Sequence, residues 1–81
     1  MKKEISLIGL VTMLAVLKKN CKLSDSAVSK VMSNNSLFES VVKQELNVSD
    51  MDLFRLFILC EQWQDGTNLE IFNFRLGEKD A

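Results

Sequence analysis

The side chains that could do chemistry in this sequence are two cysteines, Cys21 and Cys60, and a scattered set of carboxylates, because the chain has no histidine. A serine or cysteine nucleophile is normally activated by an adjacent histidine base, and no such pair can form here. The cysteines do not form a CxxC pair, so a zinc site would need an unusual carboxylate set. Two cysteines are also too few for a disulfide framework, so we expect free, mostly buried thiols in the reducing cytoplasm.

Glycine and carboxylate positions also argue against catalysis. The three glycines, Gly9, Gly66 and Gly77, are isolated and cannot form a loop that cradles phosphate. Most paired carboxylates stand at predicted helix starts, where capping explains them. A chain of this size has little core volume left for a substrate pocket. We therefore predict no enzymatic activity, with no catalytic residue, no metal site and no cofactor.

One segment has a pattern that suggests a specific function. Residues 14–35 read LAVLKKNCKLSDSAVSKVMSNN. Within them, residues 26–32 resemble the recognition helix of helix-turn-helix repressors, and the following Ser-Asn-Asn is similar to the LacI-type headpiece. The chain has Lys18 where this family has a small residue, and Lys22 where it has glycine. The resemblance implies a second helix in the DNA major groove. The side chains facing DNA would be Asp25, Ser26, Ser29 and Lys30.

Composition and charge indicate the class of protein and how charge is distributed along the chain. The 81 residues are 47% apolar and 26% charged and include no proline, which favours a single helical domain spanning 1–81. The net charge is −1 but is unevenly divided. Residues 1–43 carry seven lysines against three acids, a net +4, whereas residues 44–81 carry a net −5. Such a division can orient a partner or steer self-association.

Helix-start chemistry recurs along the chain. Ser24 and Ser49 each precede an acidic first turn, and Ser36 and Thr67 each open a capping box that ends in glutamate. Gly66 and Gly77 suit left-handed helix ends. These signals predict five helices near 3–20, 25–33, 37–46, 50–64 and 68–76. The last segment also has strand-like residues, so a strand at 69–76 is the alternative. The fold class is all-α, a compact array of four or five short helices.

The N-terminus imitates a secretory signal, with two lysines before an apolar stretch from Ile5 to Leu17. However, Glu4 stands in the region that should be positive, and the stretch runs into Lys18 and Lys19 instead of a small-residue cleavage site. The stretch is also too short to span a bilayer. Because lysines lie only at its ends, it lacks the basic face of a membrane-surface helix. We expect a core helix, no membrane partner and a cytoplasmic protein.

The strongest functional signal is surplus apolar surface. The first predicted helix is apolar nearly all round, and the helix at 50–64 has more than one apolar face. Aromatic and aliphatic side chains supply most interface binding energy. The candidate interface residues are Leu37, Phe38, Val41, Val42 and Trp63. We predict a small non-catalytic protein-binding module (a regulator, adaptor or inhibitor) that binds another protein or a second copy of itself. The alternative is a helix-turn-helix transcriptional regulator using residues 14–35, and the sequence does not define the partner.

Overall fold

The computed structural model describes residues 6–77 and confirms the all-α prediction. Within them lie four α-helices: α1 (Leu7–Cys21), α2 (Asp25–Ser33), α3 (Phe38–Leu46) and α4 (Asp50–Gln64). Two short 3₁₀ turns accompany them, η1 (Asn35–Leu37) and η2 (Glu70–Asn73). No strand occurs between residues 6 and 77. The predicted start of the first helix at residue 3 lies outside the described residues.

Serine caps set two of the helix starts as predicted. The Ser24 and Ser49 hydroxyls accept hydrogen bonds from the backbone N–H groups of Ala27 and Asp52, each at 3.1 Å. The predicted cap at Ser36 is wrong. Ser36 lies inside η1 and donates from its N–H and hydroxyl to Asn34 Oδ1, while α3 begins without a side-chain cap. Because η1 precedes α3, the capping side chain here is that of Asn34, which caps η1.

Three residues in left-handed backbone conformation end the helices. Lys22 (φ 63°) follows α1, Asn47 (φ 52°) follows α3, and Gly66 (φ 75°) follows α4 by two residues. Glycine and asparagine adopt this conformation at low cost, but a lysine does so under strain. The Lys22 and Leu23 N–H groups both donate to the Leu17 carbonyl, which holds the corner between α1 and α2.

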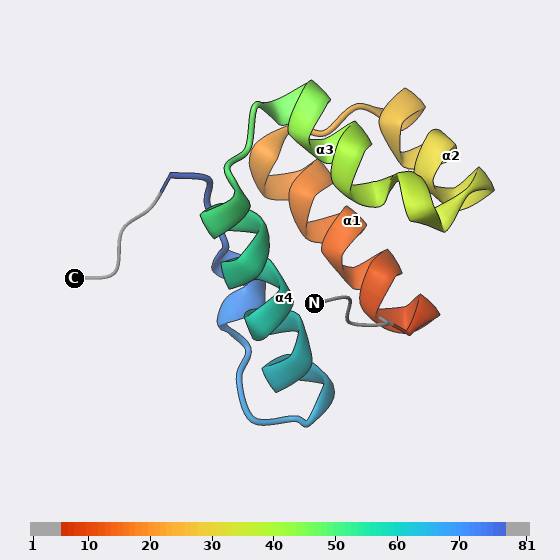
Figure 1. The fold of residues 1–81 in the computed structure, drawn as a ribbon. Coiled ribbons are helices and arrows are strands. Elements are labelled where there is room, and N and C mark those ends of the chain that lie inside the picture. Colours follow the sequence, from red (N-terminus) through yellow and green to blue (C-terminus); the bar gives the residue numbers. More distant parts are fainter. Residues whose placement is uncertain (1–5, 78–81) are drawn as a thin grey trace.

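The helices surround α1, which crosses the centre of the molecule (Figure 1). α2 and α3 pack together on one side of it, and α4 with η2 packs on the other. The buried apolar residues form one connected core. Its largest fully buried side chains come from every α-helix and from the C-terminal segment: Met13, Leu17, Val31, Val42, Leu56, Cys60, Ile71 and Phe74.

The C-terminal segment differs from both predictions made for it. Residues 68–76 form neither a helix nor a strand but the single turn η2 followed by extended chain. The Thr67 hydroxyl donates to the Gln62 carbonyl and does not cap a helix. Residues three apart lie on the same side of a 3₁₀ turn, so Ile71 and Phe74 enter the core together. Burial of these two side chains therefore outweighs the local helix and strand signals.

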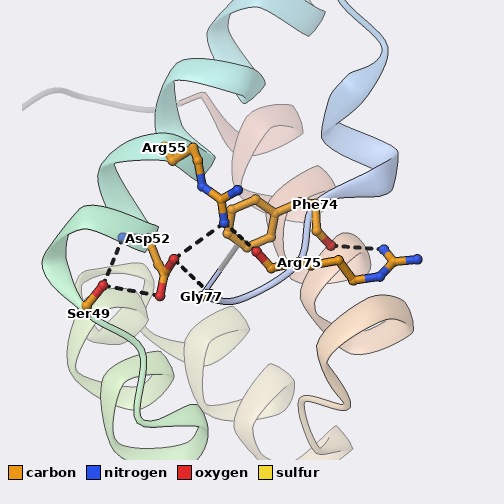
Figure 2. Close-up of polar contacts among 6 residues, drawn as sticks. All are labelled: Ser49, Asp52, Arg55, Phe74, Arg75 and Gly77. Atoms are coloured by element: carbon orange, nitrogen blue, oxygen red, sulfur yellow. Dashed lines mark hydrogen bonds and ion pairs between the residues drawn. The ribbon is translucent and has the colours of Figure 1, made fainter. Parts of the chain in front are cut away.

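A polar cluster holds the end of this segment against α4 (Figure 2). The Arg55 guanidinium lies 4.5 Å from the centre of the Phe74 ring, donates to the Arg75 carbonyl and pairs with Asp52 at 3.4 Å. Asp52 also accepts hydrogen bonds from the Ser49 hydroxyl and the Gly77 N–H, each at 3.1 Å. The Asp52 and Arg55 side chains are only 13% and 21% exposed. The start of α4 is thereby fastened to the end of the C-terminal segment.

Within the described residues, no helix is both long and apolar enough to cross a membrane.

Candidate protein interface

The outward side of α1 is apolar over its first half. Leu7, Ile8 and Val11 are all exposed, Ile8 to 68%, and Ala15 continues the same side. Residues four apart share one side of a helix, which places Leu7, Val11 and Ala15 in one row. The opposite side of the helix is buried in the core and includes Leu10, Leu14 and Leu17. We call Leu7, Ile8, Val11 and Ala15 the α1 face.

The outward side of α4 is also apolar near its start. Met51 is 75% exposed and Phe54 is 58% exposed, while Ile58, one turn further on, is half-buried. The inward side of α4 buries Leu53, Leu56 and Cys60 completely or nearly so. We call Met51, Phe54 and Ile58 the α4 face. Two helices that each bury one side thus leave a second apolar side in solvent.

An open hollow of about 430 Å³ lies where the start of α1 meets the end of α4, lined by Ser6, Ile8, Trp63 and Gln64. The Gln64 side-chain amide donates to the Ser6 hydroxyl at 2.8 Å, and these two side chains line one part of the hollow. The Trp63 ring meets the half-exposed Phe72 ring edge to face, with centroids 5.7 Å apart. This end of the molecule therefore presents aromatic and aliphatic side chains beside the Ser6–Gln64 hydrogen bond.

The structure divides the five predicted interface residues. Phe38, Val41 and Val42 are buried in the core, because positions three and four apart on α3 face inward together. The Phe38 ring packs against Phe57 of α4, with centroids 6.0 Å apart. These three side chains have almost no surface to offer a partner. Leu37 is exposed and Trp63 is half-buried, so only these two remain accessible.

Sequence reasoning found the surplus apolar surface but assigned it in part to Phe38, Val41 and Val42, which the structure buries in the core. Besides Leu37, exposed apolar side chains on the first and fourth helices carry the surplus: Leu7, Ile8, Val11, Met51 and Phe54. Their signal was present, because the first and fourth predicted helices have apolar residues on more than one side. Periodicity does not say which of two apolar sides faces inward, however, and only packing against α2, α3 and η2 decides it.

The four side chains predicted to face DNA are all exposed, and Asp25 among them pairs with Lys18. Ser26, Ser29 and Lys30 all lie on the outward side of α2. Lys22 takes the left-handed conformation at the turn before α2. Lys18, which stands where the family has a small residue, is exposed. Its ammonium group lies at the surface, where it pairs with Asp25 at 2.7 Å. The corner thus has a helix–turn–helix connection with a polar, accessible second helix.

Both cysteines are free thiols, and burial raises the pKa of each. Burial raises the pKa of Cys60, and the nearby Glu61 carboxylate raises it further. Its sulfur is 3.5 Å from the Gly9 carbonyl oxygen, to which the thiol donates. Burial is also the main cause of the raised pKa of Cys21, although the Leu76 backbone opposes it. Both thiols stay protonated near neutral pH, which makes them poor nucleophiles.

No three histidine, cysteine or carboxylate side chains between residues 6 and 77 are placed to hold a metal ion. Comparisons with protein-family models, curated proteins and solved structures found no match. The arrangement of the chain's own residues is therefore the basis for a functional proposal.

Proposed function

We propose that this chain is a small non-catalytic protein-binding module, acting as a regulator, adaptor or inhibitor through the α1 and α4 faces. The observation that carries the proposal is the exposure of large apolar side chains on both faces, including Ile8, Met51 and Phe54. Burying one such side chain fully contributes about 1.5–3 kcal/mol. Exposed apolar patches of this kind are typical of binding sites. The free thiols are consistent with a cytoplasmic location.

Affinity capture from cells of the source organism tests this proposal. We expect the wild-type chain to retain a specific protein that Val11→Asp or Phe54→Asp loses, since a carboxylate in the centre of an interface is desolvated without a partner. Met32→Asp is the matched control, because Met32 is exposed on α2, outside both faces. Circular dichroism establishes that each variant is folded. Equal capture by all four proteins would show that neither face binds a partner.

A second function is supported by the α1–α2 corner, and we propose duplex DNA as its ligand. The supporting observation is the exposed row of Ser26, Ser29 and Lys30 beside Lys22 at the turn. Fluorescence anisotropy with random-sequence duplex at about 50 mM and about 200 mM salt tests it, because counterion release makes such binding strongly salt-dependent. Lys30→Ala should weaken binding and reduce the salt dependence. Absence of binding at the lower salt would refute this function.

A further inference from the structure

The C-terminal segment is bound to α1 and α4 through its main chain as well as its side chains. Three helix side chains bind main-chain groups of the segment: Asn20 donates to the Phe72 carbonyl, Arg55 donates to the Arg75 carbonyl, and Asp52 accepts from the Gly77 N–H. The two contacts from α4 are visible in Figure 2. Contacts to main-chain groups do not depend on which side chain the bound residue carries. The two helices therefore hold an extended chain by bonds that other sequences can also form.

Selection by side chain is confined to a few positions of the segment. Ile71 and Phe74 are buried in the core, whereas Phe72, Asn73 and Arg75 are exposed. Peptide-binding sites commonly hold the ligand's main chain by hydrogen bonds and accept its side chains at separate positions. The surface of α1 and α4 beneath residues 70–77 has both features, and we call it the segment site.

The turn that leads into the segment is fastened to the last turn of α4. The Thr67 N–H and hydroxyl both donate to the Gln62 carbonyl, at 3.0 and 2.8 Å. The Asn68 side-chain amide donates to the Gln62 side chain at 2.7 Å. These bonds end at residue 68, so residues 70–77 can leave the segment site without breaking them. The segment is thus a unit that can separate from the helices.

We propose that the segment site binds an extended segment of a partner protein, and that the chain's own C-terminal segment occupies the site as a built-in competitor. The partner's segment carries an aliphatic side chain and, three residues later, an aromatic one, as at Ile71 and Phe74. This surface is distinct from the α1 and α4 faces, so the inference goes beyond the proposed function. The site is closed at rest and opens when the C-terminal segment is displaced.

A different protein is a better occupant than a second copy of this chain. A segment joined to its site by a short turn has an effective concentration on the order of millimolar. The same segment in a second copy makes the same contacts at a far lower concentration, so it displaces little. A different segment can gain contacts in the hollow beside Ile8 and Trp63, which adjoins the Phe72 ring. The chain's own segment leaves that hollow open, whereas a segment not joined to α4 can fill it with a further apolar side chain.

Fluorescence anisotropy with the full chain and a labelled synthetic peptide of residues 68–77 tests the proposal. The wild type should bind the peptide weakly, because its own segment competes. Phe74→Ala in the full chain should bind at least about ten-fold more tightly, since apparent affinity follows the fraction of molecules whose site is open. If Phe74→Ala does not fold, Phe74→Leu weakens the same contact and should bind about three-fold more tightly.

Phe38→Ala is the matched control for destabilisation. It removes the same atoms from a buried phenylalanine on α3, outside the segment site, and should not improve peptide binding. Equal gains from Phe38→Ala and Phe74→Ala would show that general loss of stability exposes the binding surface, and would overturn the proposal. The proposal also fails if neither Phe74→Ala nor Phe74→Leu binds the peptide at about 1 mM.

Changes in the peptide and in the site test the contacts themselves. Peptides with Ile71→Ala or Phe74→Ala should bind about ten-fold more weakly or worse, whereas Asn73→Ala should bind like the parent, because Asn73 is exposed. In the Phe74→Ala protein, Asn20→Ala should weaken binding about three- to ten-fold by removing one main-chain hydrogen bond. Gln44→Ala, which removes an exposed amide on α3, should not. Equal binding by all these peptides would place the probe outside the segment site and refute the inference.

Sedimentation velocity of the wild type at the same concentrations separates a partner protein from a second copy. A monomer supports the partner protein. A dimer that Phe74→Ala abolishes would show that copies exchange their C-terminal segments, which overturns that choice. Val11→Asp and Phe54→Asp change the α1 and α4 faces and should leave peptide binding by Phe74→Ala unaltered. Failure of the proposed function and failure of this inference are therefore seen independently.

Discussion

Replacing Phe74 with alanine should show that the C-terminal segment is part of the core. Phe74 is 2% exposed and is covered by the Arg55 guanidinium, 4.5 Å from its ring centre. Removing a fully buried phenylalanine side chain typically costs about 3–5 kcal/mol. A domain of this size has a free energy of unfolding of about 4–12 kcal/mol. Phe74→Ala should therefore remove about a quarter or more of the total stability.

Phe72→Ala is the matched comparison, because it removes the same atoms two residues earlier. Phe72 is 48% exposed and its main contact is the edge-to-face pair with Trp63. Half the burial of a phenylalanine and one aromatic pair together contribute about 1–3 kcal/mol. The loss for Phe74→Ala should thus exceed the loss for Phe72→Ala by about 2 kcal/mol.

Equilibrium unfolding in urea, followed by far-ultraviolet circular dichroism, measures both free energies. Circular dichroism is preferable to tryptophan fluorescence here, since Phe72 contacts Trp63 and its removal would change the fluorescence directly. If Phe74→Ala is too unstable to study, Phe74→Leu should lose about 1–2 kcal/mol and still exceed any conservative change at Phe72. Equal losses for Phe74→Ala and Phe72→Ala would refute the placement of this segment in the core.

Three further outcomes depend on individual residues. Ser49→Ala should lower the free energy of unfolding by about 1 kcal/mol by removing the α4 cap, as measured in the same urea titration, and an unchanged midpoint would contradict that role. Lys22→Gly should raise the free energy of unfolding by about 0.5–1 kcal/mol, because glycine adopts the left-handed conformation without strain. Lys19→Gly, inside α1, should instead lower the free energy of unfolding by about 1 kcal/mol. Burial raises the pKa of Cys60 above its ordinary value of 9.0, so the folded state keeps the proton longer than the unfolded state does. The stability due to this thiol is fully present below pH 9.0 and is lost as the pH rises further, and thermal melts of Cys60→Ala should show a flatter alkaline decline than the wild type.

Local chemistry in the sequence was enough to locate most of the helices. The serine caps at Ser24 and Ser49 and the apolar periodicity predicted helices at 25–33 and 50–64, and α2 and α4 have those bounds. Caps act through hydrogen bonds within three residues, so they do not depend on the rest of the fold. The same local signals failed at Ser36 and Thr67, whose hydroxyls bond to Asn34 and to the Gln62 carbonyl instead.

The candidate interface could be predicted only in part. The sequence indicated that the first and fourth helices have more apolar surface than one core-facing side requires, and it placed Ser26, Ser29 and Lys30 on one side of a helix. It did not show that Phe38 and Val42 fill the core while Ile8 and Phe54 stay in solvent. All four are ordinary core residues by type. The apolar residues of α3 lie on one side, which faces inward, whereas α1 and α4 each have two apolar sides and spacing does not say which is buried.

By itself, then, the sequence determined the all-α class, the helix positions that caps define, and the existence of surplus apolar surface. The tertiary structure alone decided which apolar sides are buried and what residues 68–76 become. The physical reason is the range of the interactions. Capping and helix periodicity act between residues a few positions apart, whereas burial depends on contacts between segments distant in the chain. Ile71 and Phe74 bury themselves against α1 and α4, and that gain outweighs the local preference of their own segment.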